Sequence, residues 1–113
     1  MKCTVYEYRD IFGRSPYARW LKHLRDPRAK AKIILQVDKM ELGLFADVEP
    51  IGEGLSELRI HYGPGYRIYF GKQGRLVYLL LCGGDKSSQS QDIKKAKARW
   101  HDYQRRNNDG DYY

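Results

Sequence analysis

Residues 55–70, LSELRIHYGPGYRIYF, constrain the fold most, because they have the pattern of a β-hairpin. A turn at 63–65 predicts four facing pairs: Tyr62 with Tyr66, His61 with Arg67, Ile60 with Ile68, and Arg59 with Tyr69. Side chains alternate between the two faces of a strand. One face is therefore apolar, and the other carries Arg59, His61, Arg67 and Tyr69. This polar face has the chemistry of a phosphate-binding surface.

The length and charge of the chain limit the alternatives. A chain of 113 residues can bury a substantial core, so we expect a single domain over 1–113, with a flexible tail at about 107–113. The formal net charge is +7, from 21 Lys and Arg against 14 Asp and Glu. Such a surplus favours an anionic partner such as nucleic acid.

The two cysteines, Cys3 and Cys82, are too few and too far apart for a zinc or redox motif. We expect both to be reduced, buried thiols, and we expect no metal ion and no cofactor. No apolar stretch resembles a signal peptide or a membrane span. The expected protein is soluble, cytoplasmic and without a membrane partner.

Two helices are predicted before the hairpin. Ser15 and Asp26 are each an N-cap residue followed by a proline in the first helical position. Because the two helices follow each other so closely, we expect an antiparallel helical hairpin. Residues 3–8 have the composition of a strand, whereas Pro50 and its neighbouring glycines predict a loop at 45–54.

The chain after the hairpin predicts one more strand and one more helix. Residues 76–82 are almost wholly apolar, as in a central strand covered on both faces. Gly83 and Gly84 end this strand and would let a ligand approach the backbone. Ser88 and Gln91 have the spacing of a capping box for the last helix. The expected fold is α+β, in the order β-α-α-β-β-β-α, with the helical hairpin packed on an antiparallel meander sheet and a C-terminal helix.

This order and two motifs carry a family resemblance. The motifs are ELRIHYGPGYRIYF at 57–70 and LLLCGGDKSSQ at 79–89. The chain resembles the RelE/ParE superfamily of small toxins up to about Tyr103, and most closely the addiction module killer protein branch, which is RelE- and HigB-like. The resemblance implies a toxin of a type II toxin-antitoxin system. It further implies a ribosome-dependent endoribonuclease that cuts mRNA and inhibits translation, and a cognate antitoxin of the helix-turn-helix type.

The polar hairpin face offers candidates for RNA cleavage without a metal ion. This chemistry needs a base for the 2′-hydroxyl, an acid for the departing 5′-oxygen, and cations that stabilise the charge developing at phosphorus. Arg67 is the best candidate to grip the phosphate, because a guanidinium makes bidentate bonds to its oxygens. Arg59 could share this role. His61 is a candidate proton carrier, since histidine titrates near neutral pH.

Further candidates lie beyond the hairpin. Lys86 is either a second phosphate contact or the acid, and Asp85 is a possible proton carrier, as the histidine and aspartate of HigB-like members imply. Residues 89–92 lack the tyrosine that RelE-like toxins carry near the start of the last helix. Tyr69 or Tyr103 could replace it, although neither occupies the motif position. Residues expected to contact RNA outside the catalytic set are Tyr69, Lys94 and Lys95, in addition to Arg59.

The same residues allow other interpretations of the site and of the function. Arg59 and Arg67 could be solvated charges on an ordinary surface, and Asp85 could simply stabilise a helix start. A ParE-like chain would poison DNA gyrase and cut no RNA, and a non-catalytic chain would bind the antitoxin and act as a co-repressor. A gyrase supercoiling assay separates the first alternative from a nuclease, and harmless overexpression with retained antitoxin binding would indicate the second.

Overall fold

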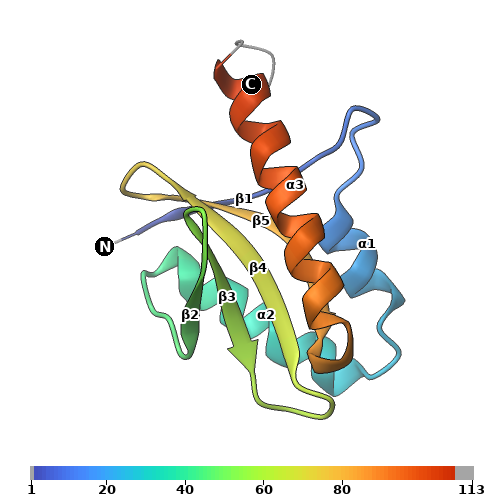
Figure 1. Ribbon diagram of the computed structural model, residues 1–113. Helices are drawn as coiled ribbons and strands as arrows, with labels where there is room; N and C mark the ends of the chain where they lie inside the picture. The colour runs from blue at the N-terminus through green and yellow to red at the C-terminus, as the bar shows by residue number, and fades with distance from the viewer. Residues whose placement is uncertain (1, 109–113) are drawn as a thin grey trace.

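The computed structural model describes residues 2–108, in which a five-stranded sheet is combined with three α-helices (Figure 1). In chain order the elements are β1 (Thr4–Glu7), α1 (Pro16–His23), α2 (Pro27–Glu41), β2 (Val48–Gly52), β3 (Leu55–Ile60), β4 (Tyr66–Gln73), β5 (Val77–Asp85), a 3₁₀ turn η1 (Lys86–Ser88) and α3 (Gln89–Asn108). The predicted α+β class with a C-terminal helix is confirmed.

The sheet extends the predicted meander on both sides. Its strand order is β1-β5-β4-β3-β2, and β3, β4 and β5 form the expected antiparallel meander. The first strand joins it parallel to β5, with Thr4 opposite Val77. The apolar strand β5 lies inside the sheet and is buried along most of its length, as predicted.

The loop predicted at 45–54 is wrong, because β2 occupies half of it. This strand pairs antiparallel with β3, with Val48 opposite Leu58 and Glu49 opposite Glu57. It forms one edge of the sheet, where a proline is tolerated because its missing N–H faces no neighbouring strand. Pro50 therefore masks the strand in the sequence without preventing it.

The register predicted for the hairpin is also wrong, by two residues. The observed partners are Ile60 opposite Tyr66 and Arg59 opposite Arg67. The turn is wider than predicted because the Gly65 amide donates to the Tyr62 carbonyl at 3.1 Å, and both strands stop short of it. A shift of two leaves every side chain on its predicted face. It also releases His61 from the sheet ladder.

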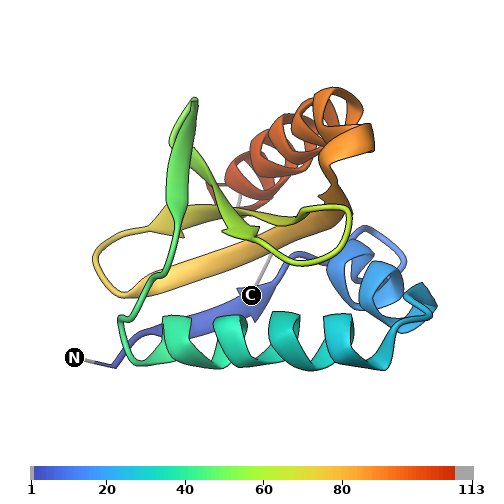
Figure 2. The same ribbon diagram turned by 90° about the horizontal axis from the view of Figure 1, so that it is seen from below.

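The two faces of the sheet bury separate cores (Figure 2). The helices α1 and α2 cover one face, and α3 covers the other (Figure 2). The core under α1 and α2 includes Ile33, Met40, Leu58, Ile68 and Phe70, and the core under α3 includes Leu55, Tyr69, Leu81, Trp100 and Tyr103.

The cysteines bear out only part of the expectation. Cys82 is buried in the core under α3, whereas Cys3 is half-buried, and both are free thiols. Burial raises the pKa of Cys82 to about 11, so its thiolate is scarce at neutral pH.

The first two helices begin as predicted. The Ser15 hydroxyl accepts a hydrogen bond from the Ala18 amide at 3.1 Å, and the Asp26 carboxylate accepts one from the Arg28 amide at 2.9 Å. Each proline follows its cap, where its missing N–H costs nothing.

The last helix, α3, begins at Gln89, directly after the predicted cap Ser88, but the predicted capping box is wrong. The capping residue is Asp85 and not Ser88, and the cap begins η1, which runs directly into α3. Residues 107 and 108 belong to α3 rather than to a tail, and 109–113 lie outside the described residues. No helix within residues 2–108 is long and apolar enough to cross a membrane.

Gly83 and Gly84 serve packing rather than ligand approach. A Cβ on Gly83 would lie 2.2 Å from the ring of Trp20, and one on Gly84 would lie 1.8 Å from a carboxylate oxygen of Asp92. Trp20 belongs to α1 and Asp92 to α3, on opposite faces of the sheet. The glycine pair therefore lets helices from both sides approach β5 closely.

Candidate active site

The turn between β3 and β4 and the 3₁₀ turn η1, which leads into α3, form a cleft. Figure 1 shows the two segments next to each other. The cleft has a volume of about 410 Å³, and its lining includes three cationic residues and a histidine, which are Arg59, Arg67, Lys86 and His61. They come from β3, β4, η1 and the turn, respectively. The fold thus gathers four of the five residues proposed for catalysis at one site.

Arg67 is held in a fixed orientation at the edge of this cleft. Its Nε donates to Glu57 Oε2 at 2.9 Å, and its Nη1 donates to the Gly65 carbonyl at 2.9 Å. Glu57 is itself nearly buried and accepts two further hydrogen bonds from Gln89 Nε2, at 3.0 and 3.2 Å. The remaining terminal nitrogen, Nη2, has no partner among residues 2–108. Arg67 therefore keeps part of its guanidinium for a ligand.

Arg59 is bound by two carboxylates, one just before β2 and one within it. Its Nη2 lies 3.1 Å from Asp47 Oδ1 and 2.9 Å from Glu49 Oε1. The hydrogen bond to Asp47 raises the pKa of Arg59 further above its usual value, although burial works against this. Arg59 and Arg67 are direct cross-strand partners, and like charges in this position repel. The carboxylates offset a repulsion that the fold itself creates.

His61 lies in the turn and is largely exposed to solvent. Its side chain is 74% exposed, and its Nε2 lies 2.5 Å from Asp47 Oδ2. This hydrogen bond, and then the one from Arg59, lower the pKa of Asp47. Asp47 thus contacts two of the predicted residues at once.

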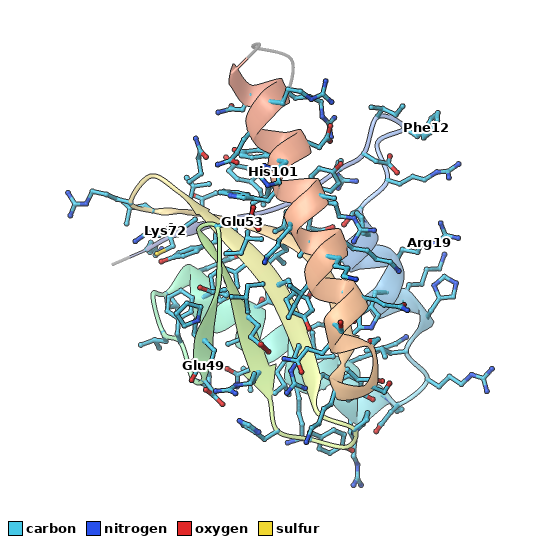
Figure 3. All side chains as sticks on the ribbon, in the orientation of Figure 1. Phe12, Arg19, Glu49, Glu53, Lys72 and His101 are labelled. Carbon is cyan, nitrogen blue, oxygen red and sulfur yellow. The ribbon has the colours of Figure 1, made fainter. Side chains whose placement is uncertain are left out.

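Asp47 and Glu49 are residues of this site that the sequence patterns do not predict. They precede and occupy β2, the strand that was predicted as a loop. In Asp47, Val48 and Glu49 the polar side chains alternate with an apolar one, and this alternation was the available signal. Glu49 is labelled on β2 in Figure 3.

Lys86 reaches the site because η1 follows β5 directly. A Cβ on Gly65 would lie 3.7 Å from the Lys86 Cβ, which places η1 against the hairpin turn. Lys86 is exposed, and its ammonium has no ion-pair or hydrogen-bond partner within the described chain. It is available to an incoming anion.

Asp85 does not line the cleft, contrary to the expectation. Its carboxylate accepts hydrogen bonds from the Ser87 amide at 2.8 Å and the Ser87 hydroxyl at 2.5 Å. These bonds lower its pKa. Asp85 therefore acts as the cap of η1, and its ionised carboxylate has no proton to donate.

Tyr69 was expected to contact RNA, and its burial contradicts this. Its side chain is fully buried under α3, and burial raises its pKa far above the usual value. Arg59 and Arg67 share its face of the sheet but lie nearer the turn of the hairpin. Tyr103 is also buried in this core, so neither tyrosine can replace the missing RelE-type base.

Lys94 and Lys95 are exposed on α3, and neither lines the cleft. A second cleft of about 430 Å³ adjoins the first and shares Arg59 and His61 with it. It adds Lys32 and Gln36 from α2, and the Lys32 ammonium lies 5.1 Å from the ring centre of Tyr62. The Asp47 carboxylate also lines this second cleft.

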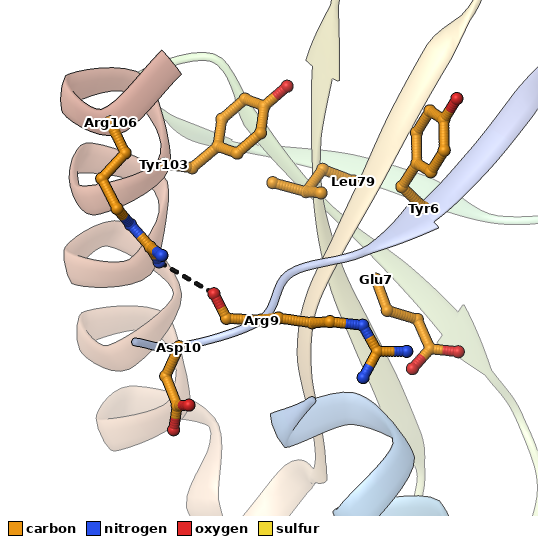
Figure 4. Close-up of a pocket in the computed structure, with 7 residues that line it drawn as sticks. All are labelled: Tyr6, Glu7, Arg9, Asp10, Leu79, Tyr103 and Arg106. Carbon is orange, nitrogen blue, oxygen red and sulfur yellow. Dashed lines mark hydrogen bonds between the residues drawn. The ribbon is translucent and has the colours of Figure 1, made fainter. Parts of the chain in front are cut away.

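A third cavity lies between β1 and α3, and of the residues considered in the sequence analysis it contains Tyr103 (Figure 4). It is lined in part by Glu7, Arg9, Asp10 and Arg106, and Arg106 donates to the Arg9 carbonyl at 2.8 Å. Its carboxylates offset its cations, so it attracts a phosphate less than the first cleft does. Across residues 2–108 no group of three or more His, Cys, Asp or Glu side chains is arranged to hold a metal ion.

Comparison with known proteins identifies the family. The family described as "Phage derived protein Gp49-like (DUF891)" matches residues 19–101, which include all four residues of the first cleft named above. The chain is also similar to an uncharacterized protein of Haemophilus influenzae, with 47% identity over 78 residues, which cover 69% of this chain and 79% of the relative. The protein therefore belongs to the phage-derived Gp49-like family, a RelE-like toxin family in the broad sense.

Proposed function

We propose that this protein is the toxin of a type II toxin-antitoxin system and acts as a ribosome-dependent, metal-independent mRNA endoribonuclease. The observation that supports this most is the cleft at which Arg59, His61, Arg67 and Lys86 meet. Carboxylates offset the charges of the facing Arg59 and Arg67, but Arg67 Nη2 and the Lys86 ammonium have no partner among residues 2–108 and can bind a phosphate. This arrangement favours binding of an RNA backbone over a purely structural role.

The reaction proceeds by attack of the RNA on itself. The 2′-oxygen loses its proton to a base and forms a bond to phosphorus, while the bond from phosphorus to the 5′-oxygen breaks. The departing 5′-oxygen takes up a proton from an acid, which leaves a 2′,3′-cyclic phosphate and a 5′-hydroxyl. Arg67, with Arg59, stabilises the negative charge on the phosphate oxygens, and His61 and Lys86 are the proton carriers.

Dependence on the ribosome fits the open shape of the site. His61 and Lys86 are exposed, so the protein alone does not hold an RNA strand in one geometry. A ribosome that fixes the mRNA would supply the missing orientation, which is a large part of the rate in reactions of this kind. Inhibition of translation would follow from the loss of the message, and a cognate helix-turn-helix antitoxin would hold the toxin inactive.

The test is cleavage of a defined mRNA on translating bacterial ribosomes by the purified protein. We expect cuts only in the presence of ribosomes, with 2′,3′-cyclic phosphate and 5′-hydroxyl ends. A 2′-O-methyl group at the cut nucleotide should block the reaction, because it removes the nucleophile. Products with 5′-phosphate ends would contradict the mechanism. An intact mRNA together with inhibition of gyrase supercoiling would replace the proposal with the ParE-like alternative.

A further inference from the structure

Asp47, which directly precedes β2, contacts β3 and the turn after it through three of its atoms. Its carbonyl accepts a hydrogen bond from the Arg59 amide at 2.8 Å, and its two carboxylate oxygens contact Arg59 Nη2 at 3.1 Å and His61 Nε2 at 2.5 Å. Backbone and side chain are therefore both tied to the β3 side of the cleft. Asp47 holds the exposed ring of His61 at one of its two nitrogens.

This contact decides which nitrogen of His61 carries the proton. The hydrogen bonds from His61 and Arg59 hold the pKa of Asp47 below its usual range, so its carboxylate is ionised at neutral pH. An ionised carboxylate can only accept hydrogen bonds, and Nε2 must therefore be the donor. In the neutral ring this leaves the lone pair on Nδ1, the nitrogen that is free to act on a substrate.

We propose that Asp47 is a positioning residue that makes His61 the general base, acting through Nδ1, and leaves Lys86 as the proton donor. This inference rests on the proposed nuclease function and assigns the two proton carriers within it. Nδ1 takes the 2′-hydroxyl proton as the bond from the 2′-oxygen to phosphorus forms. The Lys86 ammonium gives a proton to the 5′-oxygen as its bond to phosphorus breaks.

The charges around His61 explain why the base needs this carboxylate. The cations Arg59, Arg67 and Lys86 line the first cleft with it, and Lys32 from α2 lines the second. All of them disfavour the imidazolium that forms when His61 takes up a proton. The carboxylates on this side are Asp47, which contacts His61 directly, and Glu49, which contacts Arg59 but not His61.

That difference between the two carboxylates supplies a matched pair of variants. Asp47→Asn and Glu49→Gln each remove one negative charge from Arg59, but only Asp47→Asn changes the partner of His61. We expect Asp47→Asn to lower kcat by roughly 10²-fold with little change in KM, because a general base contributes about that much. The acidic limb of its pH profile should move to lower pH. Glu49→Gln should leave that limb in place.

The protonation of the ring can be measured without any cleavage. In ¹⁵N-histidine-labelled protein, NMR should show His61 protonated at Nε2, and Asp47→Asn should weaken this preference. His101 is an internal control, because its Nε2 lies 2.9 Å from Glu53 Oε1, away from the cleft, and its spectrum should not change (Figure 3).

The outcomes separate the inference from the function it rests on. The role of Asp47 is overturned if NMR shows the His61 ring protonated at Nδ1. It is also overturned if Asp47→Asn leaves the acidic limb of the pH profile in place, even if the wild type cuts mRNA. A wild type that cuts no mRNA while His61 is protonated at Nε2 overturns the nuclease function and with it the base role. Loss of kcat with a shifted limb and an altered ring supports both.

Discussion

Arg67 and Glu57 form an ion pair of 2.9 Å between Nε and Oε2, with side chains only 12% and 6% exposed. Glu57 lies on β3, Arg67 on β4, and Gln89 at the start of α3 contacts the same carboxylate. The pair therefore fixes the guanidinium that we propose binds phosphate, and connects it to the helix that covers the sheet.

Removing Glu57 alone should be costly for stability. Glu57→Leu leaves the nearly buried charge of Arg67 without its counter-ion, and the expected loss is about 3–5 kcal/mol of unfolding free energy. The double variant Glu57→Leu/Arg67→Met should recover most of this loss, because an apolar pair needs no counter-charge. Chemical denaturation of the two single variants and the double variant measures the coupling. Additive losses would show that the pair is not coupled.

The close contact between Gly83 and Trp20 predicts that a larger side chain at position 83 lowers the unfolding free energy. Gly83→Ala places a methyl group within 2.2–2.5 Å of ring atoms of Trp20, and overpacking of this kind costs about 1–3 kcal/mol. Trp20→Leu removes the ring, so the added cost of Gly83→Ala should largely disappear in that background. Thermal or chemical unfolding of the four proteins tests this. If Gly83→Ala lowers the unfolding free energy equally in both backgrounds, the added methyl group does not clash with Trp20.

Tyr8 should make stability depend on pH in the alkaline range. Burial, and then the hydrogen bond of 2.6 Å to Asp102 Oδ2, raise its pKa to about 12 from the ordinary value of 10.0. A pKa that is higher in the folded state contributes stability that is complete below pH 10 and is lost as the pH rises through 12. Tyr8→Phe should be less stable at pH 8 and lose less stability between pH 10 and 12.

The tyrosines that are buried besides Tyr8 are the same in both proteins, so their contribution cancels in this comparison; they are Tyr17, Tyr66, Tyr69, Tyr78 and Tyr103. The measurement is the unfolding free energy of wild type and variant at several pH values from 8 to 12. Parallel curves for the two proteins would contradict the role of Tyr8.

The parts of the fold that the sequence predicts best are those set by neighbouring residues. Ser15 and Asp26 cap helices because a side-chain oxygen reaches an amide two or three residues away. The faces of the hairpin follow from alternation alone, and they survived a register error of two residues. The width of the turn depends on the hydrogen bond from Gly65 to Tyr62, which the residue types do not specify.

What the sequence does not show are contacts between distant elements. Which polar-face residues stay exposed depends on where α3 begins, and therefore Tyr69 is buried under the helix while Arg59 and Arg67 border the cleft. Asp47 reaches His61 only because β2 pairs with β3, and Pro50 hides that strand. The gathering of Arg59, His61, Arg67 and Lys86 was predictable, since alternation and the short path from β5 to η1 place them together.

The central claim is that Arg67 stabilises charge on a phosphate of mRNA. Its most direct test is the rate at which the variants cut mRNA on translating ribosomes. Arg67→Ala should lose at least ~10² in rate. Arg67→Lys keeps a cation beside Glu57 but lacks the guanidinium fork, and it should also be impaired while remaining folded. Arg75→Ala removes the same charge from an exposed position in the turn between β4 and β5 and is the matched control. The account predicts slow cleavage by both Arg67 variants and normal cleavage by Arg75→Ala, and undiminished cleavage by Arg67→Ala would contradict it.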